Sequence, residues 1–200
     1  MRKIFLSMIL IVCLLISCSC ITAVPEDNQI QSDNEKGTSD SVNNTANQTN
    51  SPSQNSYKGE LYGLKVKTLD GKTLDNPFCD GNLVMINVWA TWCAPCIEEL
   101  PALDKLSREN EQMGVKIYGV LFDSDSDGAI ENAKNILQKN AVSYPQLVLD
   151  EQLKEKLIDA YDVTALPTTF FVDPDGNIMS TEVGANEYTE WQTLIDKVIG

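Results

Sequence analysis

The chain has 200 residues, with 15 Lys and Arg against 29 Asp and Glu, and it contains no histidine. The net charge of −14 argues against a nucleic-acid partner, because a polyanion would be repelled. The lack of histidine excludes Ser-His-Asp hydrolases, Cys-His proteases and His-Glu-x-x-His zinc enzymes, which all need the imidazole. Thiols and carboxylates are the groups left for catalysis.

The N-terminal segment has the pattern of an export signal. A basic pair precedes an apolar stretch over 4–16, which has the length of a signal-peptide core and is short for a membrane-spanning helix. The stretch ends in Leu-Ile-Ser-Cys, which resembles a bacterial lipobox and predicts a signal peptide over 1–17 with Cys18 as the lipidated first residue. We therefore expect an extracytoplasmic protein, lipid-anchored to the bacterial cell membrane. Cleavage near Ala23 and an uncleaved anchor are the alternatives.

A polar linker follows the signal. Residues 25–56 carry almost no apolar side chains, so burial cannot offset the entropy of ordering them. We predict a disordered linker over 18–56 and one folded domain over 57–200. Roughly 140 residues are enough to bury a real core.

The folded domain alternates between strand and helix patterns. Residues 83–89 are apolar on both faces, which is typical of a strand in a sheet covered by helices. Asp173-Pro174-Asp175-Gly176 is a strong hairpin turn. A mixed α/β sheet flanked by helices, with parallel strands first and an antiparallel hairpin last, is therefore the predicted fold class. In chain order the pattern predicts a strand over 64–69, a turn at 70–71, strand 83–89, a helix over 95–112 kinked at Pro101, strand 115–122, helix 127–140, strand 146–149, helix 151–161, strands 168–172 and 178–183, and a helix capped by Asn186 that runs to Ile199.

Two cysteines stand at the predicted junction of strand and helix. Cys93 lies where the helix begins, so unsatisfied backbone N–H groups and the helix dipole should stabilise its thiolate. We expect Cys93 to attack a substrate disulfide and Cys96, one turn later, to resolve the mixed disulfide. The Cys93–Cys96 disulfide is then the redox group, and no further cofactor is expected.

Other uses of the Cys-x-x-Cys pair are weaker. A zinc site needs four ligands, and the mature domain offers only Cys79 as a third thiolate and no histidine, so no metal is expected. Copper delivery of the kind seen in thioredoxin-like copper chaperones needs the missing histidine as well. A static structural disulfide remains an alternative.

Three motifs in order give a specific resemblance. The run Asn-Val-Trp-Ala-Thr-Trp-Cys-Ala-Pro-Cys over 87–96 is followed by Glu-Glu-Leu-Pro over 98–101 and by Leu-Pro-Thr-Thr-Phe over 166–170. Together they resemble the TlpA/ResA family of membrane-tethered thioredoxin-like proteins, over roughly residues 60–200. The resemblance implies a thioredoxin-like fold with a TlpA-type central insertion over 127–149.

The resemblance also assigns the substrate-binding surface. Pro167 matches the cis-proline that faces the dithiol, and the backbone of Leu166 would pair with an extended substrate. Trp92 and Pro95 flank the cysteines and belong to the same surface. A trans-proline in an ordinary loop before a strand is the alternative.

Glu99 is the predicted proton partner of the dithiol. It lies three residues beyond Cys96 on the helix, so the two side chains share nearly one face, where a carboxylate can accept or return the thiol's proton. The resemblance implies an active-site acid here, whereas a solvated surface carboxylate, as expected for Glu98, is the alternative. Asn87 stands where plain thioredoxins carry a buried acid, and because an amide cannot transfer a proton, the acid-base task shifts to Glu99. Cys79 is expected to be a small core or loop residue.

The resemblance implies an extracytoplasmic thiol-disulfide oxidoreductase, expected to be monomeric and to reduce disulfides in exported proteins. An integral-membrane thiol electron donor would recharge it. A disulfide-donating oxidase, a thiol peroxidase and a non-catalytic binding lipoprotein are the alternatives. The peroxidase needs a Pro-x-x-x-Thr-x-x-Cys run that the chain lacks, and the intact dithiol argues against the binding protein.

Overall fold

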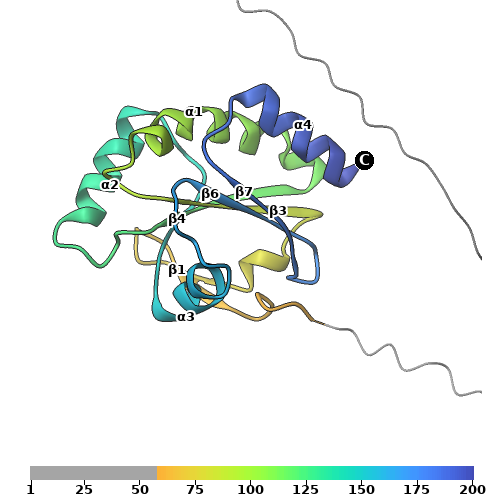
Figure 1. Cartoon of the computed structure of the whole chain (residues 1–200), viewed down its shortest axis with the longest axis horizontal. Helices are drawn as coiled ribbons and strands as arrows, with labels where there is room; N and C mark the ends of the chain where they lie inside the picture. The colour runs from red at the N-terminus through yellow and green to blue at the C-terminus, as the bar shows by residue number, and fades with distance from the viewer. Residues whose placement is uncertain (1–57) are drawn as a thin grey trace, which may run out of the picture. The chain divides into compact units, whose positions relative to one another are not determined.

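The computed structural model describes residues 58–200 (Figure 1). The predicted signal peptide, Cys18 and the whole of the predicted linker lie outside these residues. No helix within 58–200 is both long enough and apolar enough to cross a membrane. A five-stranded sheet forms the centre of the described domain, in the order β5 (Gln146–Val148), β4 (Val115–Leu121), β3 (Leu83–Trp89), β6 (Thr168–Val172) and β7 (Ile178–Val183).

The sheet is mixed, as predicted. Strand β3 is parallel to β4, and β4 is parallel to β5, whereas β6 runs antiparallel to β3 and to β7. Every residue of β3 is buried, because elements cover both faces of the sheet. The described domain therefore has the predicted thioredoxin-like α/β architecture.

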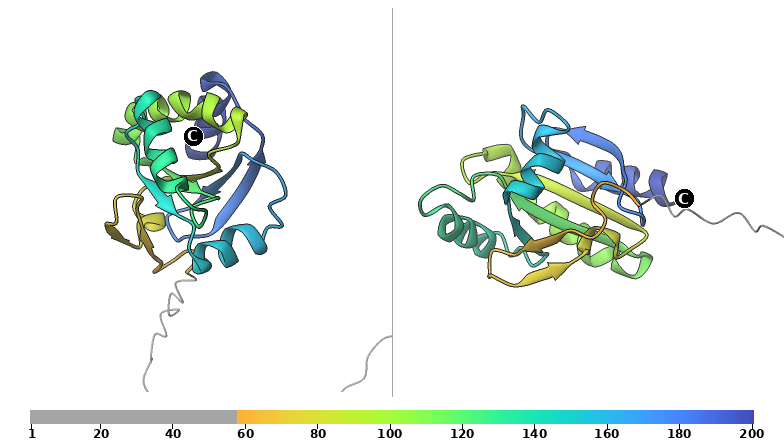
Figure 2. Two further views of the ribbon diagram at one scale, coloured as in Figure 1. Left: turned by 90° about the vertical axis from the view of Figure 1, so that its left-hand side faces the viewer. Right: turned by 90° about the horizontal axis from the view of Figure 1, so that it is seen from below.

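Three helices cover one face of the sheet, and smaller elements cover the other (Figures 1 and 2). Several of these helices begin or end a few residues from the predicted bounds. The helix predicted over 151–161 is a short α-helix that continues as a π-helix. The first face carries α1 (Ala94–Glu109), α2 (Ala129–Lys139) and α4 (Tyr188–Ile199). The other elements are β1 (Lys65–Lys67), β2 (Thr73–Asp75), α3 (Glu151–Leu153), the π-helix η3 (Lys154–Asp159) and the 3-10 turns η1 (Pro77–Cys79) and η2 (Glu111–Met113).

The start of α4 differs from the prediction. Its N-cap is Glu187 rather than Asn186, and a reciprocal capping box joins Glu187 to Glu190. The backbone N–H of Asn186 donates instead to Oε2 of Glu99, at 3.3 Å. Asn186, the residue predicted to cap α4, is therefore bonded to Glu99 on α1 and does not cap the helix.

A row of polar residues crosses the sheet at one level. Asn87 in β3 is paired with Gly119 in β4 and with Thr169 in β6, and Gly119 is paired with Gln146 in β5. Paired residues in neighbouring strands project to the same face of a sheet. The side chains of Asn87, Thr169 and Gln146 are buried, so this row forms a polar stripe in an otherwise apolar core.

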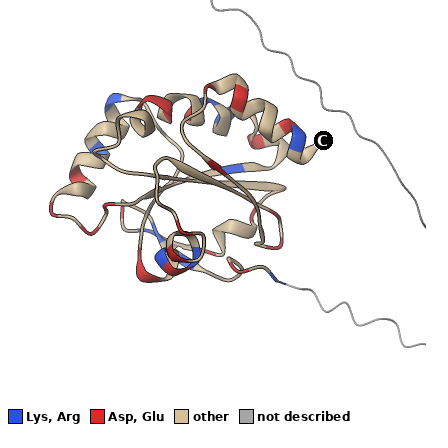
Figure 3. Ribbon diagram, in the orientation of Figure 1, with Lys and Arg blue, Asp and Glu red and all other residues tan. Residues whose placement is uncertain are grey.

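The acidic surplus is spread over the domain. Figure 3 shows Asp and Glu in helices on both sides of the sheet, with Lys and Arg interspersed among them. Several basic residues pair with acidic neighbours, as Lys65 does with Asp75 at 2.9 Å. Exposed pairs of this kind contribute little to stability, so the fold depends on its core.

Candidate active site

The two cysteines lie where the sequence analysis placed them, at the start of α1. They form a disulfide with a Cα–Cα distance of 5.3 Å. Cys93 is the N-cap of α1, and its Sγ accepts the backbone N–H of Cys96 at 3.3 Å. Cys93 retains 5% exposure whereas Cys96 is fully buried. The sulfur at the helix terminus is therefore the one that a partner can reach.

The loop before the cysteines is fixed by Asp123, which lies just beyond the end of β4. The Thr91 hydroxyl donates to Oδ2 of Asp123 at 2.6 Å, and the Thr91 backbone N–H donates to Oδ1 at 3.2 Å. Asp123 itself is only 9% exposed. The neighbouring Trp92 has 67% of its surface exposed, so a rigid loop presents a large aromatic side chain beside Cys93.

Pro167 borders the same end of the sheet. The Leu166–Pro167 peptide bond is cis, as predicted. Thr168 is paired with Val88 in β3, so Pro167 lies next to the point where β3 gives way to the cysteine loop. Leu166 packs against the core cluster that contains both cysteines.

Glu99 is buried on α1, at 4% exposure. Its Oε1 accepts a hydrogen bond from Nδ2 of Asn87 at 2.8 Å, and its Oε2 accepts the N–H of Asn186 at 3.3 Å. Burial raises the pKa of Glu99 to about 7, although the bonds from Asn87 and Asn186 favour the ionised form and lower it. The nearby indole N–H of Trp191 also lowers the pKa of Glu99, although it forms no hydrogen bond with any described residue. The carboxyl group therefore keeps its proton to a higher pH than an ordinary glutamate does.

A small cavity leads from Glu99 to the surface. It has a volume of about 140 Å³ and lies between the first turns of α1 and the segment that enters α4. Its lining includes Pro95 and Glu98 on one side and Asn186 and Glu187 on the other. Glu99 is therefore a core residue that also lines a cavity at the surface of the domain.

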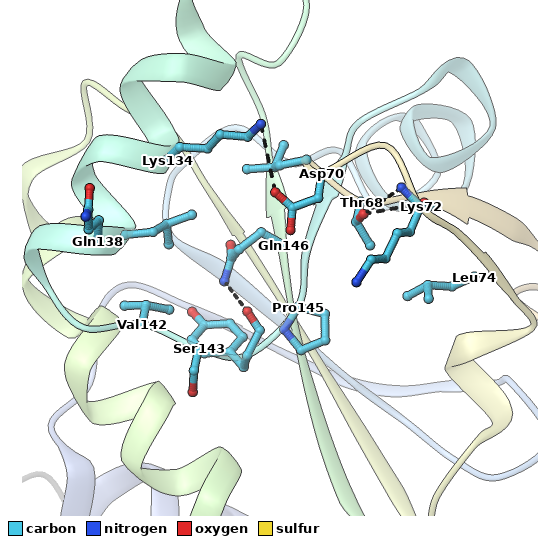
Figure 4. Close-up of a pocket in the computed structure, with 13 residues that line it drawn as sticks. Thr68, Asp70, Lys72, Leu74, Lys134, Gln138, Val142, Ser143, Pro145 and Gln146 are labelled. Carbon is cyan, nitrogen blue, oxygen red and sulfur yellow. Dashed lines mark hydrogen bonds and ion pairs between the residues drawn. The ribbon is translucent and has the colours of Figure 1, made fainter.

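A second cavity, of about 660 Å³, lies at the β5 edge of the sheet, between α2 and the β1–β2 hairpin (Figure 4). Gln146 lines this cavity, and its Oε1 accepts the indole N–H of Trp89 at 2.9 Å. Lys134 and Asp70 form an ion pair at 3.9 Å between α2 and the hairpin. Neither cysteine lines it, so this cavity is separate from the dithiol.

Sequence reasoning missed four residues of the site: Thr169, Asn186, Asp123 and Thr91. Thr169 accepts a hydrogen bond from Nδ2 of Asn87 at 3.0 Å. A polar residue in a buried strand is the signal that could have found Thr169. Asn186 and Asp123 follow turns where polar residues are common, so their sequence gives no such signal. No group of three or more metal-ligating side chains lies together within residues 58–200.

Comparison with known proteins gives the site its context. The AhpC/TSA family matches residues 60–181. "Thiol-disulfide oxidoreductase ResA" of Bacillus anthracis is 29% identical over 139 residues, which cover 70% of this chain and 76% of the relative. The protein of the same name from Bacillus subtilis is 33% identical over 119 residues, which cover 60% and 63%.

Solved structures agree on the fold. A thioredoxin-family thiol:disulfide interchange protein from Chlorobium tepidum superposes with a TM-score of 0.62 at 23% identity, covering 72% of this chain and 97% of that one. StoA from Bacillus subtilis superposes with a TM-score of 0.54 at 21% identity, covering 66% and 95%.

The fold and the Cys-x-x-Cys pair define a thioredoxin-like thiol-disulfide oxidoreductase, with Cys93 and Cys96 as its redox pair. The chain belongs to the AhpC/TSA family, and its similarity to ResA proteins agrees with the resemblance found in its motifs.

Proposed function

We propose that this protein reduces disulfides in exported proteins, with Cys93 as nucleophile, Cys96 as resolving thiol and Glu99 as proton partner. The observation that carries the proposal is the unequal exposure of the two sulfurs, together with the buried carboxyl group that follows Cys96 on α1.

The reaction would proceed in two exchanges. The Cys93 thiolate attacks one sulfur of the client disulfide, a new S–S bond joins Cys93 to the client, and the other client sulfur leaves as a thiolate. Cys96 then attacks Sγ of Cys93, forming the disulfide present in the structure and releasing the second client thiolate. Two electrons pass from the protein to the client, and each released thiolate takes a proton from solvent.

Glu99 would act in the second exchange. Cys96 must lose its proton before it can attack, and it is fully buried, so solvent cannot serve it directly. A carboxyl group with a pKa of about 7 can accept that proton near neutral pH and pass it to solvent through the adjoining cavity.

The client would bind across the loop of Leu166 and Pro167. Within residues 58–200, the backbone N–H and C=O of Leu166 form no hydrogen bond. These groups are therefore available to pair with an extended segment, as one strand pairs with another. The exposed ring of Trp92 and the neighbouring Pro95 would border that segment.

The proposed setting is extracytoplasmic. We propose that Cys18 carries a lipid anchor, that residues 18–56 tether a monomeric domain to the membrane, and that an integral-membrane thiol donor restores the dithiol. A secreted Mycobacterium tuberculosis disulfide oxidoreductase, 18% identical over 69% of this chain, is among the proteins with the same fold.

Trapping tests the mechanism. In cells that express the full chain, Cys96→Ser should accumulate mixed disulfides through Cys93 with exported proteins, whereas Cys93→Ser should accumulate none. Equal trapping by both variants would contradict the assigned roles. A measured reduction potential well above roughly −200 mV would contradict the reductase direction and favour disulfide donation.

A further inference from the structure

Asn87 is the polar group in closest contact with Glu99. It lies in β3, six residues before Cys93, and is fully buried. Its Nδ2 donates both to Oε1 of Glu99, at 2.8 Å, and to Oγ1 of Thr169, at 3.0 Å. The amide thus joins the carboxyl group of α1 to the sheet.

The other end of this amide is unsatisfied. Among the described residues, Oδ1 of Asn87 is buried and has no hydrogen-bond partner. A buried carbonyl oxygen without a donor loses its bonds to water and gains none in return, so such atoms in a native core call for an explanation.

The protonation of Glu99 offers an explanation for the unpartnered Oδ1 of Asn87. An ionised carboxylate offers only acceptors, so the NH₂ end of Asn87 must face it. A protonated carboxyl group offers an O–H donor, which needs an acceptor such as Oδ1. A half-turn of the amide would bring Oδ1 to Glu99. The hydroxyl of Thr169, which can both accept and donate, would serve either orientation.

We propose that Asn87 is a positioning residue that serves both protonation states of Glu99, donating through Nδ2 to the carboxylate and accepting through Oδ1 from the carboxylic acid. Proton uptake by Glu99 and the turn of the amide are then one event. This inference rests on the proposed role of Glu99 as the proton partner of Cys96.

The consequence is a buried acid that finds a partner on Asn87 in either of its protonation states. An ionised aspartate at position 87 could only repel the Glu99 carboxylate or accept from the Glu99 acid, and a leucine would leave the effect of burial on the Glu99 pKa unopposed. Asn87 keeps the carboxyl group able to gain and lose a proton during each turnover.

Few other titratable groups lie close enough to Glu99 to affect its protonation. Asn87, which bonds to Glu99, and Thr169, which bonds to Asn87, carry no titratable group, and in the oxidised protein Cys96 does not titrate either. The titratable side chains that share a cavity with Glu99 are Glu98 on α1 and Glu187 and Glu190 at the start of α4. Tyr144, ahead of β5, also interacts with Glu99 electrostatically. In the reduced protein Cys96, three residues before Glu99 on α1, adds a thiol.

The test follows Glu99 and Asn87 by NMR in the oxidised full chain. The carboxyl carbon of Glu99 is assigned with Glu99→Gln, and the side-chain amide of Asn87 with Asn87→Leu. In the unsubstituted protein, we expect the contact between the Nδ2 protons and the Thr169 methyl group to change with the same midpoint as the Glu99 titration. A contact that stays constant through that titration would make Asn87 a fixed donor and overturn the proposal.

Substitution gives the second measurement. We expect Asn87→Leu to raise the Glu99 midpoint by about one pH unit, because the charge-assisted hydrogen bond lost by the carboxylate is stronger than the neutral one lost by the carboxylic acid. The matched control is Asn110→Leu. Asn110, the C-cap of α1, lies eleven residues after Glu99 and is 1% exposed. Its Nδ2 donates to the C=O of Leu106 and to Oε1 of Gln192, away from Glu99. Its substitution should leave the midpoint unchanged, and an unchanged midpoint in Asn87→Leu would also overturn the proposal.

Turnover provides an independent readout. A midpoint raised by one unit lowers the ionised fraction of Glu99 at pH 7 from about one half to about one tenth, so resolution by Cys96 should slow about fivefold. The rate should recover above about pH 9. The NMR measurements need no client, so the reductase assignment could fail while the coupling of Asn87 and Glu99 holds, and the reverse.

Discussion

Glu99 should make the oxidised protein less stable as the pH rises. Burial holds the pKa of Glu99 at about 7 in the folded chain, against an ordinary value of 4.5. Between these values the folded state keeps a proton that the unfolded state has released. The stabilisation is therefore complete below the unfolded value and is lost by the time the pH passes the folded one. The raised pKa corresponds to about 3 kcal/mol of unfolding free energy.

Urea denaturation of the oxidised protein at pH 4.5 and pH 8 measures this effect. Relative to Glu99→Gln, the unsubstituted protein should lose about 3 kcal/mol of unfolding free energy between these pH values. The neighbouring Glu98 is exposed, so Glu98→Gln should keep the pH dependence of the parent. If the unfolding free energies of Glu99→Gln and of the unsubstituted protein changed with pH by the same amount, within about 0.5 kcal/mol, Glu99 would not be a buried acid with a raised pKa.

Three further predictions concern other residues. Removing the carboxylate that fixes Thr91, in Asp123→Ala, should lower the unfolding free energy by about 2 kcal/mol, and a loss below about 0.5 kcal/mol in chemical denaturation would show that the loop does not depend on it. A Cβ on Gly119 would clash with Oε1 of Gln146, so Gly119→Ala should lower the unfolding free energy by about 1–3 kcal/mol. In a double-mutant cycle, Gly119→Ala should lower the unfolding free energy much less when Gln146 is already replaced by Ala. An equal loss in that background would refute the clash. Burial raises the pKa of the Cys79 thiol, so Cys79→Ala should leave the disulfide-exchange rate within about twofold, and a larger loss would give this thiol a redox role.

The sequence predicted the strands better than the ends of the helices. The bounds of β3, β6 and β7 agree with the prediction because continuous apolar runs and a strong turn mark them. The segment over 154–159 is a π-helix because it bonds with a five-residue spacing, as from Ala160 N–H to Glu155 C=O. Buried residues at Leu153, Leu157 and Ile158 fit either kind of helix, so periodicity alone could not distinguish them.

The site was predictable where its residues are close in sequence. Cys93, Cys96 and Glu99 share one helix, so their spacing alone places them together. The partners of Glu99 come from β3 and from the segment before α4. Those contacts depend on how α1 packs over the sheet, which no local pattern records.

The polar cluster around Glu99 is better explained by chemistry than by stability. Asn87, Glu99 and Thr169 occupy core positions where apolar side chains of similar size would cost less to bury. The cluster joins the strand that precedes the dithiol loop to the helix that follows it, and on that helix Glu99 lies three residues after the buried Cys96. A buried thiol that must lose and regain a proton needs a buried group to exchange it with. The unfolding free energy lost to a carboxyl group in the core is therefore consistent with a site that moves protons away from water.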